Sequence, residues 1–254
     1  LHASRPGGRF LLPVRRLAPQ EIAQALGHNR ASTTAGTTPT MTHAGTLPST
    51  LPQDPMPILE PFYREAREKK VQPNPDSMVL ASATPDGAPA ARVVLCKKVI
   101  ADPGYVVFFT NYDSRKGREL AANPRVAGVL HWDSMSRQVR LEGRVVPCPP
   151  EESDAYFSSR AIDSRIGAWA SLQSQPLDSR ATLLKRVAIE AARHGTAPTR
   201  PPHWGGYHFW LEAVELWCEG AFRVHDRARW TRSLQPAGDR AFTPGPWQAT
   251  RLYP

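Results

Sequence analysis

The chain has 254 residues, 41% hydrophobic and 22% charged, which is the composition of an ordinary folded protein with a sizeable core. Its net charge is +9, yet Arg and Lys are spread singly without the continuous basic run of a nucleic-acid binder, so small anionic ligands explain the excess at least as well. No apolar run approaches the length of a membrane span, which excludes a transmembrane protein.

Residues 1–56 are rich in Ala, Thr, Pro, Ser and Arg and have little apolar periodicity, which predicts a disordered leader. Their Arg-rich, acid-poor composition also resembles an organellar transit peptide. Because the chain begins with Leu1 and not Met, upstream translated sequence with Met41 or Met56 as a natural start explains the segment equally well. We expect the folded domain to occupy residues 57–254.

The folded part is expected to begin with a helix ending near Lys70, because Ile58, Leu59, Phe62 and Ala66 share one helical face. Short β-type runs follow, and Pro-Asp-Gly-Ala at 85–88 is a strong hairpin signal between the first two. The expected strands are residues 77–84, 90–98, 105–110, 126–132 and 138–146. Antiparallel strands at this spacing favour a barrel or sandwich, and the lack of a GxGxxG after a strand argues against a Rossmann site.

A helical block is expected after these strands. Pro149 and Pro150, followed by two acids, make a good helix start, and residues 178–194 form a second amphipathic helix closed by Gly195. Further β-type runs are expected over residues 207–217 and 222–230, with a last short segment over 247–252.

The first candidate site is the segment 108–120, which leaves an apolar strand and enters a short helix. Asp113 or Ser114 suits its N-cap, whereas Arg115 and Lys116 in the first turn oppose the helix dipole. Cations at an already positive helix end make sense if an anion binds there, and phosphate is the obvious ligand. A solvated loop with stray charge is the alternative.

A second candidate is Arg223, His225 and Arg227, which would line one face of a strand. Three potentially cationic groups on one face are expensive to bury unless an anionic ligand pairs with them. A solvent-facing sheet edge is the alternative. An HD-type metal phosphohydrolase is set aside because the further metal-ligand histidines are missing.

Two further sets of polar residues are spaced regularly. Tyr156, Arg160 and Ser164 are four apart, so a continuous helix would bring them together as a phosphate-binding trio, with a solvated helix face as the alternative. Arg92 and Lys97 are five apart and therefore lie on opposite faces of a regular strand, so both would reach one ligand only through a bulge or across the strand end.

The cysteines and histidines predict neither a disulfide framework nor a metal site. Cys96, Cys148 and Cys218 are scattered and odd in number, which favours a reducing compartment, and we expect a cytoplasmic protein. The eight histidines form no metal-ligand pattern.

Eight motifs occur in one order along residues 56–254. They are Arg92-Val-Val-Leu-Cys-Lys97, Phe109-Thr-Asn-Tyr-Asp-Ser-Arg-Lys-Gly117, Arg137-Gln-Val-Arg-Leu-Glu-Gly143, Tyr156-Phe-Ser-Ser-Arg160, Ser164-Arg-Ile-Gly-Ala-Trp-Ala-Ser-Leu-Gln-Ser174, Trp204-Gly-Gly, Arg223-Val-His-Asp-Arg227 and Arg251-Leu-Tyr-Pro254. Together they resemble the pyridoxine/pyridoxamine 5'-phosphate oxidase family. The resemblance implies an FMN-binding split β-barrel, mainly antiparallel β with flanking helices (α+β), in a homodimer with FMN at the interface.

The resemblance also assigns roles to residues. It implies FMN contacts in one subunit from Arg92, Val93, Val94, Leu95, Phe109, Thr110, Arg115, Lys116 and Gln138, with Arg115 and Lys116 on the phosphate. It implies flavin contacts from the other subunit by Gln173, Ser174, Trp217 and Arg227. It places the substrate's 5'-phosphate on Lys97, Tyr156, Arg160 and Ser164, and it implies Arg223 and His225 as catalytic residues over the pyridine ring.

The implied activity is the oxidation of pyridoxamine and pyridoxine 5'-phosphate to pyridoxal 5'-phosphate, a step of vitamin B6 biosynthesis. A hydride leaves C4' for flavin N5, and O₂ is reduced to H₂O₂. A split-barrel flavoprotein oxidase for another substrate, such as a phenazine precursor, and a flavin or pyridoxal-phosphate carrier without turnover are the alternatives.

The chain departs from the family pattern in three places. Residues 1–56 contain no convincing counterpart of the Arg-x-x-Tyr segment that closes over the substrate. The stretch from Cys218 to Phe222 replaces a more polar Gln-Gly-type stretch, and Cys96 and Lys98 stand where an aliphatic and a small residue are more typical.

Overall fold

The computed structural model describes residues 46–254, which form ten strands, five α-helices and two short 3₁₀ turns. In chain order the elements are α2 Met56–Glu68, β1 Ser77–Ala83, β2 Pro89–Ile100, β3 Tyr105–Asn111, α3 Arg115–Ala122, β4 Arg125–Trp132, η1 Asp133–Met135, β5 Arg137–Pro147, α4 Pro150–Ser159, α5 Ile162–Ala170, α6 Arg180–His194, β6 Trp204–Cys218, η2 Ala221–Arg223, β7 Asp226–Thr231, β8 Leu234–Pro236, β9 Phe242–Pro244 and β10 Gln248–Arg251.

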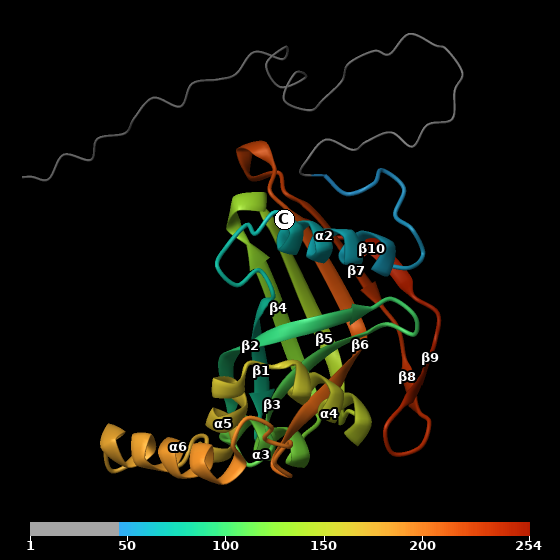
Figure 1. Ribbon diagram of the computed structural model, residues 1–254. Coiled ribbons are helices and arrows are strands. Elements are labelled where there is room, and N and C mark those ends of the chain that lie inside the picture. Colours follow the sequence, from blue (N-terminus) through green and yellow to red (C-terminus); the bar gives the residue numbers. More distant parts are fainter. Residues whose placement is uncertain (1–45) are drawn as a thin grey trace, which may run out of the picture. The chain divides into compact units, whose positions relative to one another are not determined.

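The main sheet is antiparallel and closes into a barrel (Figure 1). Its strand order is β10-β7-β6-β3-β2-β1-β4-β5, and β5 also pairs with β6, so six strands from β6 to β5 form a ring. Strands β7 and β10 extend the sheet outward from β6, which is long enough to serve both the ring and the extension. Ring closure removes the exposed sheet edges that an open sheet of these strands would present.

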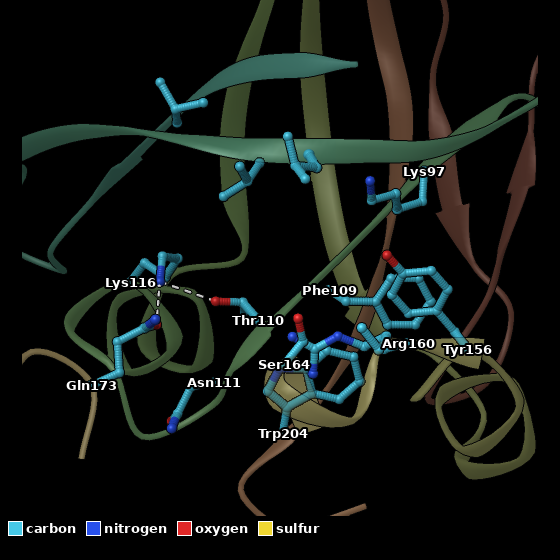
Figure 2. A pocket seen from close by; sticks show the side chains of 14 residues that line it. Lys97, Phe109, Thr110, Asn111, Lys116, Tyr156, Arg160, Ser164, Gln173 and Trp204 are labelled. Atoms are coloured by element: carbon cyan, nitrogen blue, oxygen red, sulfur yellow. Dashed lines mark hydrogen bonds between the residues drawn. The ribbon is translucent and has the colours of Figure 1, made fainter. Parts of the chain in front are cut away.

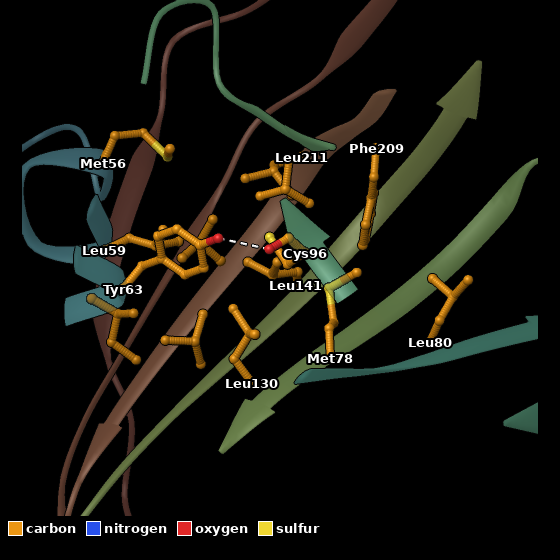
Figure 3. Close-up of a cluster of buried hydrophobic side chains, with 14 of the residues drawn as sticks. Met56, Leu59, Tyr63, Met78, Leu80, Cys96, Leu130, Leu141, Phe209 and Leu211 are labelled. Atoms are coloured by element: carbon orange, nitrogen blue, oxygen red, sulfur yellow. Dashed lines mark hydrogen bonds between the residues drawn. The ribbon is translucent and has the colours of Figure 1, made fainter. Parts of the chain in front are cut away.

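The barrel interior and the inner face of α2 form one hydrophobic core (Figure 3). Met78 and Leu130 are fully buried strand residues that belong to the same hydrophobic cluster as Leu59 on the inner face of α2. Tyr63, also on α2, buries its ring there and donates its hydroxyl hydrogen to the carbonyl oxygen of Cys96 at 2.6 Å. Each buried side chain of this size contributes about 1.5–3 kcal/mol, so α2 is held mainly by packing.

The expected mainly antiparallel split barrel with flanking helices is confirmed, and the strands of the first half lie where the periodicity of two predicts them. The hairpin between β1 and β2 forms at the expected Pro-Asp-Gly-Ala turn, with Ala83 opposite Pro89. The helices α2, α4 and α6 also match the expected ones, and the backbone N–H of Gly195 bonds to the end of α6.

The expected strand over residues 222–230 is wrong at its start. β7 begins only at Asp226, and η2 precedes it. Phe222 and Arg223 have φ of 56° and 63°, a left-handed backbone that cannot continue a strand. Arg223, His225 and Arg227 therefore do not alternate along one strand, because only Arg227 belongs to β7.

Most of the expected leader, residues 1–56, lies outside the described residues. The described part, 46–56, packs on the domain. Leu47 is 4% exposed and joins the core, and the Trp230 indole N–H donates to the carbonyl oxygen of Pro52 at 2.9 Å. The packed structure therefore includes residues upstream of the expected boundary at 57. Across residues 46–254, no helix is both long and apolar enough to cross a membrane.

Candidate functional site

A pocket of about 480 Å³ lies beside the outward face of β2, between the start of α3 and the helices α4 and α5 (Figure 2). This volume suits a bound small molecule. The pocket is lined by Val93, Val94, Leu95, Lys97, Phe109, Thr110, Asn111, Lys116, Tyr156, Arg160, Ala161, Ser164, Gln173 and Trp204. Eleven of these fourteen residues are site residues that the resemblance implies.

The β2 wall of the pocket follows from strand alternation. Val94 and Cys96 face the core, so Val93, Leu95 and Lys97 point to the other side, and Val93 is 61% exposed. The Lys97 ammonium is not free, since its Nζ lies 2.6 Å from the Asp76 carboxylate. This wall offers apolar contact area with one cation at its end.

Arg92 has the opposite orientation and does not line the pocket. Its guanidinium donates to the Ser82 hydroxyl and, at 2.8 Å, to the Glu119 carboxylate. Arg115 pairs with the same carboxylate, with Nε 2.7 Å from Glu119 Oε1. Burial alone would raise the pKa of Glu119, but the hydrogen bonds from Ser82, Arg115 and Arg92 hold it below its usual value. Neither Arg92 nor Arg115 is brought to the pocket within one chain.

Lys116 is the cation that α3 presents to the pocket. Ser114 is the N-cap, and its hydroxyl oxygen accepts from the Gly117 N–H at 3.2 Å. Lys116 Nζ donates to neutral oxygens only, at 3.0 Å to Thr110 Oγ1, 3.2 Å to Ser114 Oγ and 2.7 Å to Gln173 Oε1. Burial, and after it the nearby Arg92 guanidinium, lower the pKa of Lys116 to about 8.

The turn before α3 is tight enough to require glycine at residue 117. A Cβ there would come within 2.0 Å of the Tyr112 carbonyl oxygen. The first-turn N–H groups of any helix lack intrahelical acceptors. Together with the Lys116 ammonium they make the start of α3 a place where an anionic group is stabilised.

Three aromatic rings form a shelf, which we define as Phe109, Tyr156 and Trp204. The ring centroids of Phe109 and Tyr156 are 3.9 Å apart at 19°, and those of Phe109 and Trp204 are 5.6 Å apart at 10°. Gly206 makes room for this stack, because a Cβ there would lie 2.7 Å from the Phe109 ring. The shelf gives the pocket a flat apolar surface.

Arg160 lies over the shelf with its guanidinium carbon 4.7 Å from the Trp204 ring centroid. Its Nη1 is buried and has no hydrogen-bond partner among the described residues. Burial lowers the pKa of Arg160. A buried guanidinium nitrogen without an acceptor is costly, and an anionic ligand in the pocket would remove that cost.

Tyr156, Arg160 and Ser164 all line the pocket, but the continuous helix expected to align them is wrong. α4 ends at Ser159, Arg160 is extended with ψ of 152°, and α5 begins at Ile162. The chain bends at Arg160, so the trio converges from two helices and the link between them.

The remaining residues implied by the resemblance lie outside this pocket in the single chain. Arg227 Nε is 2.8 Å from the Glu215 carboxylate, and the Trp217 and His225 rings are 4.7 Å apart. Also outside the lining are Gln138, Ser174 and Arg223. Gln173, which the resemblance assigns to a second subunit, lies in the same chain's pocket as Lys116.

Three further residues line the pocket although no site role was predicted for them: Asn111, Ala161 and Trp204. Trp204 stands in the Trp-Gly-Gly motif, whose glycines signal a close approach of another chain segment. Asn111 directly follows the predicted site residues Phe109 and Thr110, and this position in the sequence was the signal that could have identified it. Ala161 gives no signal in the sequence.

Comparisons with known proteins identify the family of this chain. The profile of the family described as "Pyridoxamine 5'-phosphate oxidase" matches residues 65–194. A chain from Burkholderia vietnamiensis named pyridoxine/pyridoxamine 5'-phosphate oxidase is 47% identical over 201 residues, covering 79% of this chain and 89% of that one. This chain belongs to the pyridoxamine 5'-phosphate oxidase family. It is therefore an oxidoreductase, and membership of this family indicates a flavin cofactor.

Three further matches describe the family relationship more closely. A Paraburkholderia phytofirmans relative with the same name is 46% identical over 202 residues, covering 80% of this chain and 90% of its own. The crystal structure of PhzG from Burkholderia lata in complex with tetrahydrophenazine-1-carboxylic acid has a TM-score of 0.69 and 30% identity, covering 80% of this chain and 94% of that one. A profile described as the pyridoxine 5'-phosphate oxidase C-terminal dimerisation region matches residues 204–254.

Proposed function

We propose that this chain uses FMN and O₂ to oxidise pyridoxamine and pyridoxine 5'-phosphate to pyridoxal 5'-phosphate, with release of H₂O₂. The observation that carries the proposal is the charge pattern of the pocket. Lys116 and the Arg160 Nη1 have no carboxylate partner and lie on different sides of the pocket, and Arg160 lies over the aromatic shelf (Figure 2). Two separate anion-binding positions suit two phosphate-bearing molecules, one of them the cofactor.

The start of α3 fits the phosphate of FMN. Lys116 supplies a charged donor, Thr110 and Ser114 supply hydroxyl groups beside it, and the first helical turn supplies free N–H groups. FMN, when bound, supplies the acceptor for the hydride and returns the electrons to O₂. The outward face of β2, with Val93 and Leu95, offers apolar contact for a flat ring system.

The opposite side of the pocket fits the substrate's phosphate. Arg160 brings an unpaired guanidinium nitrogen, and Tyr156 and Ser164 bring hydroxyl groups. Lys97 adds a second cation whose charge is shared with Asp76. Holding the phosphate by these groups fixes the position of C4' relative to the cofactor, which is the main task left to the protein.

We further propose a homodimer in which Trp217, Arg223, His225 and Arg227 of a second copy complete the site. These residues lie outside the pocket of their own chain, and all of them fall within the matched dimerisation region. Arg223 and His225 would then cover the substrate ring at the reacting carbon. Arg223→Ala should lower turnover while FMN stays bound, and loss of FMN would contradict this role.

One preparation tests the central proposal. Purified protein should be yellow with the spectrum of oxidised flavin, and addition of pyridoxamine 5'-phosphate in air should release H₂O₂ and form pyridoxal 5'-phosphate. A colourless protein that cannot be reconstituted with FMN would contradict the whole proposal. Yellow protein without turnover of either B6 phosphate would contradict only the substrate.

The second candidate function is oxidation of a phenazine precursor, and the match to PhzG favours it. The ligand of that structure carries a carboxylate and no phosphate. The Arg160, Tyr156 and Ser164 set favours a phosphate ester for this chain. Comparing the turnover of pyridoxamine 5'-phosphate with that of a reduced phenazine carboxylate decides between the two.

A further inference from the structure

Three charged or ionisable side chains outside the pocket lining form one connected cluster. Glu152 lies in the first turn of α4. Its Oε1 is 2.8 Å from Nζ of Lys98 on β2, and its Oε2 is 2.6 Å from Nε2 of His208 on β6. We call this cluster the Glu152 clamp, and it consists of Lys98, Glu152 and His208. One carboxylate thus links a helix to two strands of the barrel.

The His208 side of the clamp is fixed by its surroundings. His208 is 8% exposed, and its ring stacks on Tyr105 with the centroids 4.4 Å apart. The exposed end is Lys98, whose side chain is 47% exposed. The buried His208 ring therefore holds one oxygen of the Glu152 carboxylate in place, and Lys98 binds the other oxygen from the solvent side.

Cys148 lies beside the clamp, with its sulfur within 4.8 Å of ligating atoms of Glu152 and His208. A Cys, Glu and His set is one that a divalent metal ion accepts. However, the Lys98 ammonium already occupies the cation's place on the carboxylate. Burial, and next the charge of Glu152, raise the pKa of the Cys148 thiol, which disfavours the thiolate that a metal requires. The cluster is therefore an internal ion-pair system.

The clamp lies next to the phosphate side of the pocket. Tyr156 follows Glu152 by one helical turn, and Lys97 is the neighbour of Lys98 on β2; both line the pocket. The distance between α4 and β2 at this level sets the distance between those two side chains. Ser153 adds a second tie, because its hydroxyl oxygen accepts the Gly206 N–H at 3.1 Å.

We propose that Glu152 is a positioning residue for the substrate's phosphate, acting through Lys98 and His208 to hold Tyr156 and Lys97 at the right separation. The inference rests on the proposed function of the pocket. Lys98 is one of the places where the chain departs from the family pattern, so the Lys98 arm of the clamp belongs to this chain's own residues. Because Ser153 still ties α4 to β6, loss of the clamp loosens the helix without detaching it.

The test uses the full-length flavin-loaded protein with Glu152→Gln and Lys98→Met, and Glu151→Gln as the matched control. Glu151 is the exposed neighbour on the same helix and makes no ion pair among the described residues. Both clamp variants should raise the KM for pyridoxamine 5'-phosphate about tenfold, with kcat within about twofold and FMN content unchanged. Lys98→Arg, which keeps the cation, should retain the original KM.

Non-additivity gives a second measurement. The Glu152→Gln/Lys98→Met double variant should raise KM no further than Glu152→Gln alone, since both substitutions break one ion pair. An unchanged KM in both single variants, or a fall in kcat at unchanged KM, would overturn the proposal. Because Lys98 is exposed, its variant should fold even if Glu152→Gln does not.

Hydrogen exchange separates this proposal from the proposed function. Amides of α4 should exchange faster in Glu152→Gln than in Glu151→Gln, whether or not the protein turns over a B6 phosphate. Equal exchange in the two variants would overturn the clamp. Titration with Co²⁺ completes the test: a thiolate-to-cobalt absorption band that disappears in Cys148→Ser would show a metal site and overturn the ion-pair assignment.

Discussion

The pocket and the outer face of β5, β6 and β7 are both rich in arginine and lysine, but they balance the charge differently. On the outer face, Arg140, Glu215 and Arg229 lie directly opposite one another on adjacent strands, and Glu142 pairs with Arg229 at 2.7 Å. Arg227 joins them through Glu215 at 2.8 Å. This charge ladder supplies its own counter-ions, as cross-strand pairs commonly do.

The pocket lacks such counter-ions at its two key positions. Lys116 donates only to neutral oxygens, and the buried Nη1 of Arg160 has no acceptor among residues 46–254. Both groups lose hydration without gaining a carboxylate. Lys116 and Arg160 therefore differ from the ladder arginines in lacking a protein counter-ion, and not in the type of the cation or its position in a motif.

The largest expected effect comes from Lys116→Met. Removing a charge-assisted phosphate contact should weaken FMN binding by the apoprotein about 100-fold, or about 3 kcal/mol. Quenching of FMN fluorescence measures the affinity. Lys185→Met on the exposed face of α6 is the control and should bind normally. Riboflavin, which has no phosphate, should bind both variants alike, and an equal loss for riboflavin would contradict a phosphate role.

The next effect is expected from Arg160→Met, which keeps the volume of the side chain. The KM for pyridoxamine 5'-phosphate should rise about 30-fold, because a charged hydrogen-bond donor to the phosphate is lost. The unfolding temperature should stay equal or rise, since a buried charge without a partner is removed. A clear fall in the unfolding temperature would contradict this, because it would show that the Arg160 charge is stabilised within the protein, like the charges of the ladder.

The pH dependence of FMN binding should be smaller but diagnostic. Because the pKa of Lys116 is lowered to about 8, its positive charge is present below that pH and lost as the pH rises through it. FMN affinity of the apoprotein should therefore fall about fivefold from pH 8 to pH 9, in step with the fraction of Lys116 that is protonated. Lys116→Met should abolish this slope, and a slope that survives the substitution would assign the titration to another group.

The smallest effect is expected in the ladder. Arg229→Met removes a partner of Glu142 on a face where both side chains remain partly exposed, so the free energy of unfolding should fall by only about 1 kcal/mol. FMN affinity and KM should not change. Urea unfolding of this variant, of Glu142→Gln and of the double variant measures the pair. Loss of FMN in Arg229→Met would break the distinction between the two regions.

Much of the fold could be predicted because its signals are local. Strand periodicity places β1 to β5, and the Ser114 cap with Gly117 marks the start of α3. The start of β7 could not be predicted in this way. Phe222 and its neighbours have strand-like composition, but the chain there turns through left-handed residues. The turn is tight, because a Cβ at Gly220 would lie only 1.8 Å from the Val224 carbonyl oxygen.

The candidate site was predictable in its residue types and only in part in its geometry. Spacing alone suggested that Tyr156, Arg160 and Ser164 converge, and they do, although through a bend at Arg160 that the spacing did not contain. The pairing of Arg115 with Glu119 is local, because the two residues are four apart on α3. The ion pair between Arg92 and the same carboxylate could not be predicted from local spacing, because it depends on how α3 packs against β1 and β2.

The sequence by itself determined the family, the positions of most strands along the chain and the candidate anion-binding residues, because these follow from motifs and from periodicities of a few residues. Only the tertiary structure decided which cations are free. Arg92 and Arg229 carry the same group as Arg160, yet Glu119 and Glu142 neutralise them from distant segments. Coulomb interactions and desolvation depend on distance in space and not along the chain, so the cations left without a counter-ion are defined only once the barrel is closed.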